Sequence, residues 1–262
     1  MSCLSFLFKS AAFFVALLAI LVGLVLSGGL EATGVFKYMD GQQFFKGMFP
    51  AYHAHEPYGF THDEMAAVDL AGDNILVTGG NVGLGYWTAH HLAARGATVV
   101  LGCRSQAKCD KAAASIKEDT GSSTVDTTLL DLGSFASIRK CAASLKAKYP
   151  QLDSLILNAG IMVPPFQLTK DGLESQIGTN HFGHFLLTDL LLPQLEAAAA
   201  AKGVATIVPV SSAAHFSSYP AGILASVEAM NDESTYSRAE AYVSEEREGA
   251  REGAREGASL LP

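Results

Sequence analysis

Three glycines, Gly79, Gly83 and Gly85, stand in the stretch T-G-G-N-V-G-L-G at residues 78–85. Residues without a Cβ let a phosphate group approach the backbone closely, and the free N–H groups of a helix start favour negative charge. The apolar run 74–77 before the glycines predicts a buried strand, and the sequence after them predicts a helix. This order of strand, glycine turn and helix predicts a dinucleotide site, with a flexible loop as the alternative.

A cation stands at the next place where a dinucleotide is usually recognised. The predicted strand 97–101 is followed by G-C-R-S, so Arg104 lies close to its end. Sites that prefer NAD place an acidic residue here against the ribose 2′-hydroxyl, whereas a guanidinium suits a 2′-phosphate. Arg104 therefore favours NADP(H), and an ordinary solvated arginine is the alternative.

Strands and helices alternate regularly after these residues. Apolar runs predict three further strands, at 125–130, 154–157 and 204–210. Helical patterns predict three helices, at 108–118, 134–148 and 173–195. Such alternation is typical of a doubly wound parallel sheet. We therefore predict an α/β, Rossmann-like domain over residues 73–243, incomplete at its C-terminal side.

Net charge and cysteine spacing limit the possible partners. The 262 residues carry a net charge of −8, which argues against nucleic acid because phosphate binding favours a basic face. The four cysteines show no C-x-x-C spacing, so we expect free thiols rather than a zinc site or a disulfide framework. They are Cys3, Cys103, Cys109 and Cys141. The histidine-containing stretch 53–63 has no second cluster to complete a metal site, so no metal is predicted.

An uncharged apolar segment precedes the predicted domain. Residues 10–30 contain no charged side chain, and 11–26 are almost entirely Ala, Phe, Val, Leu and Ile. Residues 1–30 are therefore predicted to form a transmembrane anchor, at the endoplasmic reticulum or another endomembrane. A signal peptide cut before Gly28, with secretory or organellar targeting, is the alternative. The aromatic linker 31–72 suits the membrane interface or packing onto the domain.

Five short motifs occur in an order that resembles a known family. They are T-G-G-N-V-G-L-G at 78–85, L-D-L at 130–132, L-N-A-G at 157–160, N-H-F-G-H-F-L-L at 180–187 and V-S-S-A-A-H at 210–215. Over residues 73–242 the chain resembles the classical short-chain dehydrogenases/reductases, most closely the branch similar to retinol dehydrogenases. The resemblance implies hydride transfer between NADP(H) and a lipophilic alcohol, aldehyde or ketone.

The resemblance also implies roles for individual residues. Together with the glycine turn and Arg104 discussed above, it completes the predicted cofactor-binding set: Gly79, Asn81, Gly83, Leu84, Gly85, Arg104, Asp131, Leu132, Asn158, Ala159 and Gly160. Within this set, Asp131 matches the residue that contacts the adenine ring, and 158–160 match the stretch that steadies the sheet beside the cofactor.

The catalytic set implied by the resemblance has three members. Asn180 matches the residue that holds a relay water, Ser212 the residue that hydrogen-bonds the substrate oxygen, and Tyr242 the residue that gives or takes the hydroxyl proton. The alternatives are a helix-surface amide for Asn180 and a cap or turn residue for Ser212. Three nearby histidines are expected in packing or local hydrogen bonds rather than catalysis: His181, His184 and His215.

The position four residues after Tyr242 departs from the family pattern. The family has a lysine there, one helical turn away on the same face. Its positive charge favours the ionised form of the tyrosine, which can then act as a base. This chain has Glu246, whose negative charge opposes ionisation of Tyr242. We therefore expect little or no dehydrogenase activity from the chain as it stands.

The composition also changes after Tyr242. Residues 247–258 repeat R-E-G-A, and glycine at every fourth position disfavours a helix, so we expect the tail 244–262 to be disordered. Two interpretations of this change are open. The chain is a degenerate, noncatalytic family member, or its sequence departs from that of the working protein near Ser244, and we favour the second. The rival functions are a nucleotide-binding pseudoenzyme and a membrane-tethered interaction module.

Overall fold

A computed structural model describes residues 67–212, 224 and 226–242. All of them belong to one compact unit, His62–Pro262. The expected anchor, most of the aromatic linker, and the tail with Glu246 lie outside the described residues. Within the described part of the chain, no helix combines the length and the apolar character that a membrane crossing requires.

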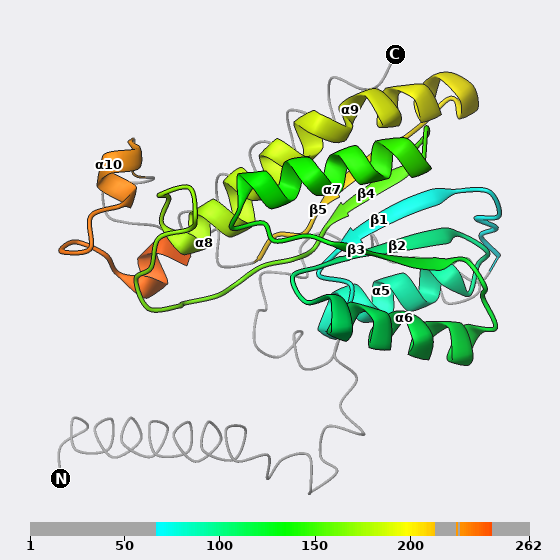
Figure 1. The fold of residues 1–262 in the computed structure, drawn as a ribbon, viewed down its shortest axis with the longest axis horizontal. Coiled ribbons are helices and arrows are strands. Elements are labelled where there is room, and N and C mark those ends of the chain that lie inside the picture. The colour runs from blue at the N-terminus through cyan, green and yellow to red at the C-terminus, as the bar shows by residue number, and fades with distance from the viewer. Residues whose placement is uncertain (1–66, 213–223, 225, 243–262) are drawn as a thin grey trace, which may run out of the picture. The chain divides into compact units, whose positions relative to one another are not determined.

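Five parallel strands form one sheet in the order β3-β2-β1-β4-β5 (Figure 1). Their bounds are β1 Asn74–Thr78, β2 Thr98–Cys103, β3 Val125–Leu129, β4 Ser154–Leu157 and β5 Thr206–Pro209. This order confirms the predicted doubly wound sheet, because β1 has β2 on one side and β4 on the other. The second strand ends two residues later than predicted, and the fifth is shorter at both ends.

Helices cover both faces of the sheet (Figure 1). The helices α5, Gly83–Ala93, and α6, Gln106–Thr120, lie on one face, and α7, Phe135–Lys148, and α9, Gly183–Lys202, lie on the other. Each face has its own apolar core, and β1 contributes Ile75 to the first and Leu76 to the second. Successive residues of a strand point to opposite faces, so the middle of the central strand, residues 75–77, must be apolar on both faces.

The helix predicted at 173–195 is interrupted near its start. A short helix, α8, Ser175–Ile177, leads into a π turn, η3, Gly178–Phe182, and then into α9. At the end of this turn the N–H of Gly183 donates to a carbonyl five residues back. Because an α-helix bonds four residues back, the turn changes the helical register directly around Asn180.

The far end of α9 lies seven residues beyond the predicted end. Five alanines, 197–201, precede Lys202 and favour continuation of the helix. Gly203 then ends it in the left-handed conformation, with φ 87°. The longer helix places Lys202 beside the start of the sheet.

Two cysteines that were predicted to be free thiols form a disulfide. Cys103, the last residue of β2, is bonded to Cys109 in the first turn of α6. Their Cα atoms lie 5.8 Å apart, within the usual span of a disulfide. The prediction is wrong for this pair because the tight connection from β2 to α6 brings the two residues together. Cys141 is a free thiol, as predicted.

Residues 226–242, with the short helix α10 at Val227–Met230, contact the loop that follows β4. The side chain of Asn231 accepts the N–H of Glu174 at 2.7 Å and donates to the carbonyl of Gly172 at 2.6 Å. These two bonds hold the segment that carries the candidate catalytic tyrosine against that loop.

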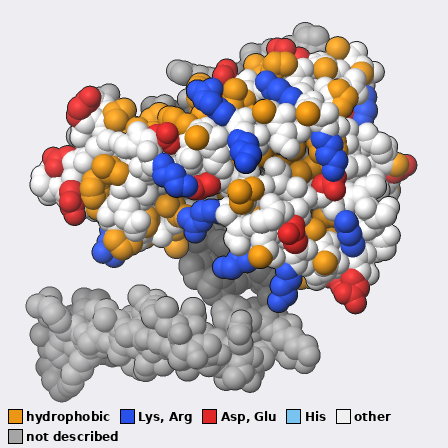
Figure 2. Space-filling model, in the orientation of Figure 1, with side chains coloured by type: hydrophobic (Ala, Val, Ile, Leu, Met, Phe, Trp, Pro, Cys, Tyr) orange, Lys and Arg blue, Asp and Glu red, His pale blue; other side chains and the backbone are white. Residues whose placement is uncertain are grey.

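Charged side chains are spread over the face of the molecule seen in Figure 2. Lys and Arg side chains lie there as separate spots, with Asp and Glu between some of them. On this face of the described residues they form no continuous basic surface of the kind that binds nucleic acid.

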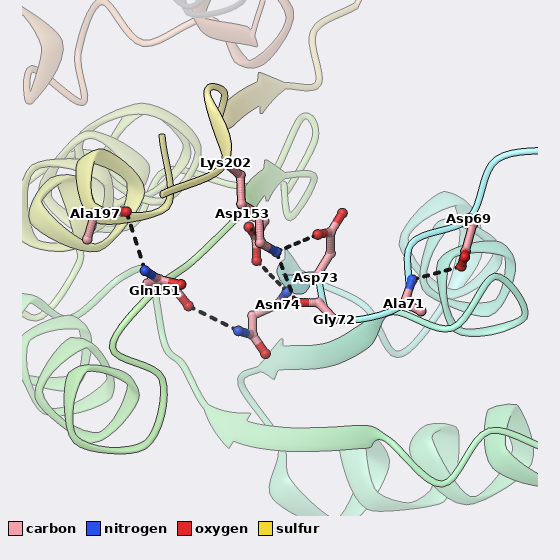
Figure 3. Close-up of polar contacts among 9 residues, drawn as sticks. All are labelled: Asp69, Ala71, Gly72, Asp73, Asn74, Gln151, Asp153, Ala197 and Lys202. Atoms are coloured by element: carbon pink, nitrogen blue, oxygen red, sulfur yellow. Dashed lines mark hydrogen bonds and ion pairs between the residues drawn. The ribbon is translucent and has the colours of Figure 1, made fainter. Parts of the chain in front are cut away.

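One lysine holds the amino-terminal edge of the sheet (Figure 3). The Nζ of Lys202 lies 2.7 Å from a carboxylate oxygen of Asp73 and 2.7 Å from one of Asp153. The other oxygen of Asp153 accepts the N–H of Asn74 at 2.8 Å. The Asp153 side chain is only 7% exposed, so Lys202 supplies the charge that compensates a nearly buried carboxylate.

Lys202→Met should destabilise the fold, because it leaves the Asp153 carboxylate buried without its cation. We expect the free energy of unfolding to fall by about 2 kcal/mol. The matched control is Lys148→Met, since Lys148 and its partner Asp126 have side chains 60% and 38% exposed; its loss should stay below about 1 kcal/mol. Urea unfolding followed by circular dichroism measures both, and equal losses would contradict the role given to Lys202.

Candidate cofactor and catalytic site

Most of the predicted site residues follow the carboxyl ends of strands, at one edge of the sheet (Figure 1). The glycine turn follows β1, Arg104 follows β2, Asp131 follows β3 and Asn158 follows β4. The strands β1 and β4 are neighbours, and the helices after them lie on opposite faces of the sheet. Open α/β sheets bind ligands at such a point, outside the carboxyl ends of the strands.

The glycine turn lies tightly against the loop after β4. Gly79 has φ 65°, and its N–H donates to the carbonyl of Gly102 at 2.7 Å. A Cβ on Gly79 would lie 2.9 Å from the Cα of Ala159, and a Cβ on Gly85 would overlap the side-chain amide of Asn158. Only glycine fits at both places, so the turn presents backbone rather than side chains.

The start of α5 is suited to an anion. Its N-cap residue is Val82, which has no side-chain acceptor for the first N–H groups of the helix. Gly83 follows as the first helical residue, Leu84 beside it is 75% exposed, and Asn81 is half-buried in the turn. Backbone N–H groups and the positive end of the helix dipole therefore meet at this point.

The residues after β2 and β3 form the outer part of the edge. Arg104 is exposed. Asp131 accepts the N–H of Gly133 at 3.2 Å with one carboxylate oxygen and pairs with Lys170 at 2.7 Å through the other. Leu132 is buried in the core, so only its backbone can face a cofactor.

The hydroxyl of Thr78, the last residue of β1, joins the two central strands. It accepts the N–H groups of Asn158 and Ala159, both at 2.9 Å. The side-chain amide of Asn158 donates to the backbone carbonyl of Thr78, also at 2.9 Å. Sequence reasoning placed Thr78 in the glycine motif without a role. A hydroxyl at the end of a buried strand, directly before a glycine turn, is the signal that could have identified it.

Asn180 holds the loop after β4 from the π turn. Its Oδ1 accepts the N–H of Ile161 and its Nδ2 donates to the carbonyl of the same residue, both at 2.8 Å. A Cβ built on Gly160 would lie 3.5 Å from the Oδ1 of Asn180. The structure thus brings the side chain of Asn180 to the loop that begins with the Asn-Ala-Gly stretch, and its catalytic role stays a prediction.

His184 connects Asn180 to Thr78. Its Nδ1 lies 2.7 Å from the backbone carbonyl of Asn180, and its Nε2 lies 2.9 Å from the hydroxyl of Thr78. Burial lowers the pKa of His184 to about 4, although the bond to the carbonyl opposes the shift. The ring is therefore neutral near pH 7. The expected role of His184 in local hydrogen bonding is confirmed.

The two remaining catalytic candidates lie in other parts of the described chain. Ser212 follows β5 and is half-buried, and Tyr242 is half-buried at the end of the helical residues 238–242. Their catalytic roles stay predictions. His215 and Glu246 lie outside the described residues. Among the residues with described positions, no group of three His, Cys, Asp or Glu side chains is placed to hold a metal ion.

A family model matches the part of the chain that forms this site. The model for short chain dehydrogenases covers residues 73–226, more than half of the 262 residues. The chain belongs to the short-chain dehydrogenase family. Short-chain dehydrogenases use NAD(P)(H). The sheet order and the glycine turn of this short-chain dehydrogenase agree with the resemblance found in its sequence.

Curated relatives of this short-chain dehydrogenase include retinol dehydrogenases. Human retinol dehydrogenase 12 is 46% identical over 148 residues, which are 56% of this chain and 46% of that protein. Human retinol dehydrogenase 13 is 44% identical over 146 residues, 56% of this chain and 43% of that protein. The chloroplastic short-chain dehydrogenase TIC 32 B of Brassica napus is 38% identical over 181 residues, 69% of this chain and 56% of that protein. The chain thus spans about half the length of these relatives.

Solved structures share the fold of this short-chain dehydrogenase. An uncharacterized protein from Mycobacterium paratuberculosis is 36% identical, with a TM-score of 0.60 over 78% of this chain and 69% of that one. RhlG of Pseudomonas aeruginosa, in complex with NADP, is 26% identical, with a TM-score of 0.57 over 73% of this chain and 70% of that one.

The buried, neutral His184 should make stability depend on pH. Its pKa is about 4 in the folded chain, whereas an unfolded histidine titrates near pH 6.5. As the pH falls, the unfolded state binds the proton first, so the free energy of unfolding decreases between about pH 6.5 and pH 4. This contribution amounts to about 3 kcal/mol, present in full above pH 6.5 and lost at the acid end.

Urea unfolding at a series of pH values measures this dependence. His184→Phe should reduce the slope of the free energy of unfolding against pH by the amount that one titrating group contributes. The control is Ala143→Gln, at an exposed position of α7, which removes no titrating group and should leave the slope unchanged. An equal slope in wild type and His184→Phe would show that His184 does not titrate as proposed.

Proposed function

We propose that this short-chain dehydrogenase is an NADP(H)-dependent oxidoreductase that transfers a hydride between the nicotinamide and a lipophilic alcohol, aldehyde or ketone. The observation that carries the proposal is the edge between β1 and β4, where the glycine turn is bonded to Asn158 and the following loop to Asn180. A ligand at this edge meets backbone N–H groups, an exposed arginine and short polar side chains. Such a set of groups fits a dinucleotide.

Each part of the cofactor has a suitable partner at this edge. The glycine turn suits the pyrophosphate, because the space beside Gly83 is open, with no atom within 4 Å of a Cβ built there, and the start of α5 favours an anion. Arg104 suits a 2′-phosphate, and the carboxylate of Asp131 suits the amino group of adenine. Residues 158–160 steady the sheet beside the cofactor. When bound, the cofactor supplies or accepts the hydride.

Asn180, Ser212 and Tyr242 are the proposed catalytic residues. Ser212 hydrogen-bonds the substrate oxygen, Tyr242 exchanges the hydroxyl proton, and Asn180 holds a water of the proton relay. Glu246 stands where a cation would favour the ionised tyrosine, so we expect slow turnover by this sequence even when the cofactor binds. A nucleotide-binding protein without turnover is the second candidate function, and Glu246 is the observation that favours it.

The substrate class is supported by the similarity to retinol dehydrogenases, whose name describes a lipophilic alcohol as substrate. The proposed partner of the uncharged residues 10–30 is a membrane, with an endomembrane as the location. The net charge of −8 gives no support for a nucleic acid partner.

NADPH should bind more tightly than NADH, because Arg104 can pair with the 2′-phosphate. We expect Arg104→Ala to weaken NADPH binding about tenfold and to leave NADH binding unchanged. Arg139→Ala, at an exposed arginine of α7, is the matched control and should change neither affinity. Isothermal titration of the full chain in mild detergent measures these affinities. Equal affinity of the wild-type protein for NADPH and NADH would remove the basis for assigning NADP(H).

A further inference from the structure

We propose that His184 is a positioning residue of the cofactor edge, whose imidazole fixes the Thr78 hydroxyl and the Asn180 carbonyl in one directional chain of hydrogen bonds. The proposal rests on the proposed function, because the edge that it positions is the one assigned to NADP(H). Its evidence is the set of distances among the buried polar groups at the ends of β1 and β4 and in the π turn.

The backbone contact fixes the tautomer of His184. The carbonyl of Asn180, 2.7 Å from Nδ1, can only accept a hydrogen bond, so Nδ1 carries the proton. A neutral imidazole has one N–H group, and Nε2 is therefore an acceptor. The Thr78 hydroxyl, 2.9 Å away, must donate to it. The direction of each hydrogen bond from Asn180 through His184 to Thr78 therefore follows from this one carbonyl.

This direction decides how the oxygen of Thr78 is used. Its proton points to His184, because the other acceptor within reach, the carbonyl of Ile156, lies farther away at 3.4 Å. Its two acceptor sites take the N–H groups of Asn158 and Ala159, at 2.9 Å each. All three hydrogen-bonding sites of this buried hydroxyl are occupied, so it has a single orientation.

The other end of the imidazole holds the π turn. There the hydrogen bonds change register, and the carbonyl of Asn180 accepts from the ring of His184. The side chain of Asn180 in turn holds the backbone of Ile161. Together with the backbone that joins Ala159 to Ile161, these hydrogen bonds close a ring through Thr78, His184 and Asn180.

Protonation or removal of the imidazole breaks this ring. An imidazolium donates from both nitrogens, so the oxygen of Thr78 would face three donors with two acceptor sites. One N–H group of the Asn-Ala-Gly stretch would then lose its buried partner. A phenyl ring in place of the imidazole has no N–H group, so the carbonyl of Asn180 would lose its side-chain donor. Either change loosens the loop that steadies the cofactor edge.

Nitrogen-15 NMR of the histidine-labelled full chain in mild detergent tests the tautomer. With signals assigned by His184→Phe, we expect a proton on Nδ1 and a hydrogen-bonded, unprotonated Nε2 at neutral pH. Thr78→Val should move the Nε2 signal to that of a nitrogen without a donor, and Thr78→Ser should restore it. A proton on Nε2, or an imidazolium at neutral pH, would overturn the proposal.

Amide hydrogen exchange and NADPH titration test the positioning. We expect His184→Phe to speed exchange at Asn158 and Ala159 about tenfold and to raise the Kd for NADPH about tenfold. Thr78→Val should behave as His184→Phe does, whereas Thr78→Ser, which keeps the hydroxyl, should recover most of the lost protection and affinity. Ala143→Gln, at an exposed position of α7, is the control and should change neither quantity.

The outcomes separate this proposal from the proposed function. If the wild-type chain binds no NADPH, the proposed function is wrong, while the tautomer and the exchange rates still decide the role of His184. If wild type binds NADPH and His184→Phe binds it equally well, His184 only packs and the positioning role is wrong. Should His184→Phe fail to fold, the Nε2 signal that moves in Thr78→Val and returns in Thr78→Ser still identifies His184 as the acceptor of the Thr78 hydroxyl, and an Nε2 signal that moves in neither variant would show that His184 only packs.

Discussion

The hydroxyl of Thr78 is the interaction on which the carboxyl edge depends. It ends β1, the central strand, and accepts both N–H groups that begin the loop after β4. The helices after β1 and β4 leave to opposite faces of the sheet, so this hydroxyl bonds the two strand ends at the point where their chains diverge. The hydroxyl is small, so it bonds the two strand ends and still lets the glycine turn approach Ala159. A Cβ built on Gly79 would lie only 2.9 Å from the Cα of Ala159.

The two edges of the sheet are stabilised by different chemistry. At the amino-terminal edge, Lys202 pairs with Asp73 and Asp153, so the charges compensate one another within the fold. Between β1 and β4 at the carboxyl edge, the contacts of Thr78 and His184 are hydrogen bonds between neutral groups. The cation of Arg104 and the start of α5 are thereby left to face an anionic ligand. This contrast supports the proposal that the cofactor binds at the carboxyl edge.

The sequence predicted the features that local patterns control. Alternation of strands and helices indicated the parallel sheet, and the spacing of the glycines indicated a turn that only glycine can form. The Cys103–Cys109 disulfide, the π turn around Asn180 and the bond from Thr78 to His184 depend on how strand ends and helices meet in space. Thr78 and His184 are 106 residues apart, so no local pattern encodes their contact. Cys103 and Cys109 are only six residues apart, but they lack the C-x-x-C spacing and are joined by the turn between β2 and α6.

Energy transfer from Trp87 to NADPH is the most direct test of a cofactor at this edge. Trp87 is the only tryptophan of the chain, lies near the start of α5 and is 56% exposed. The account predicts that NADPH quenches Trp87 emission to saturation, with sensitised emission from the dihydronicotinamide, and that excess 2′,5′-ADP reverses both changes. Quenching that rises without saturation, or that persists in excess 2′,5′-ADP, would contradict it.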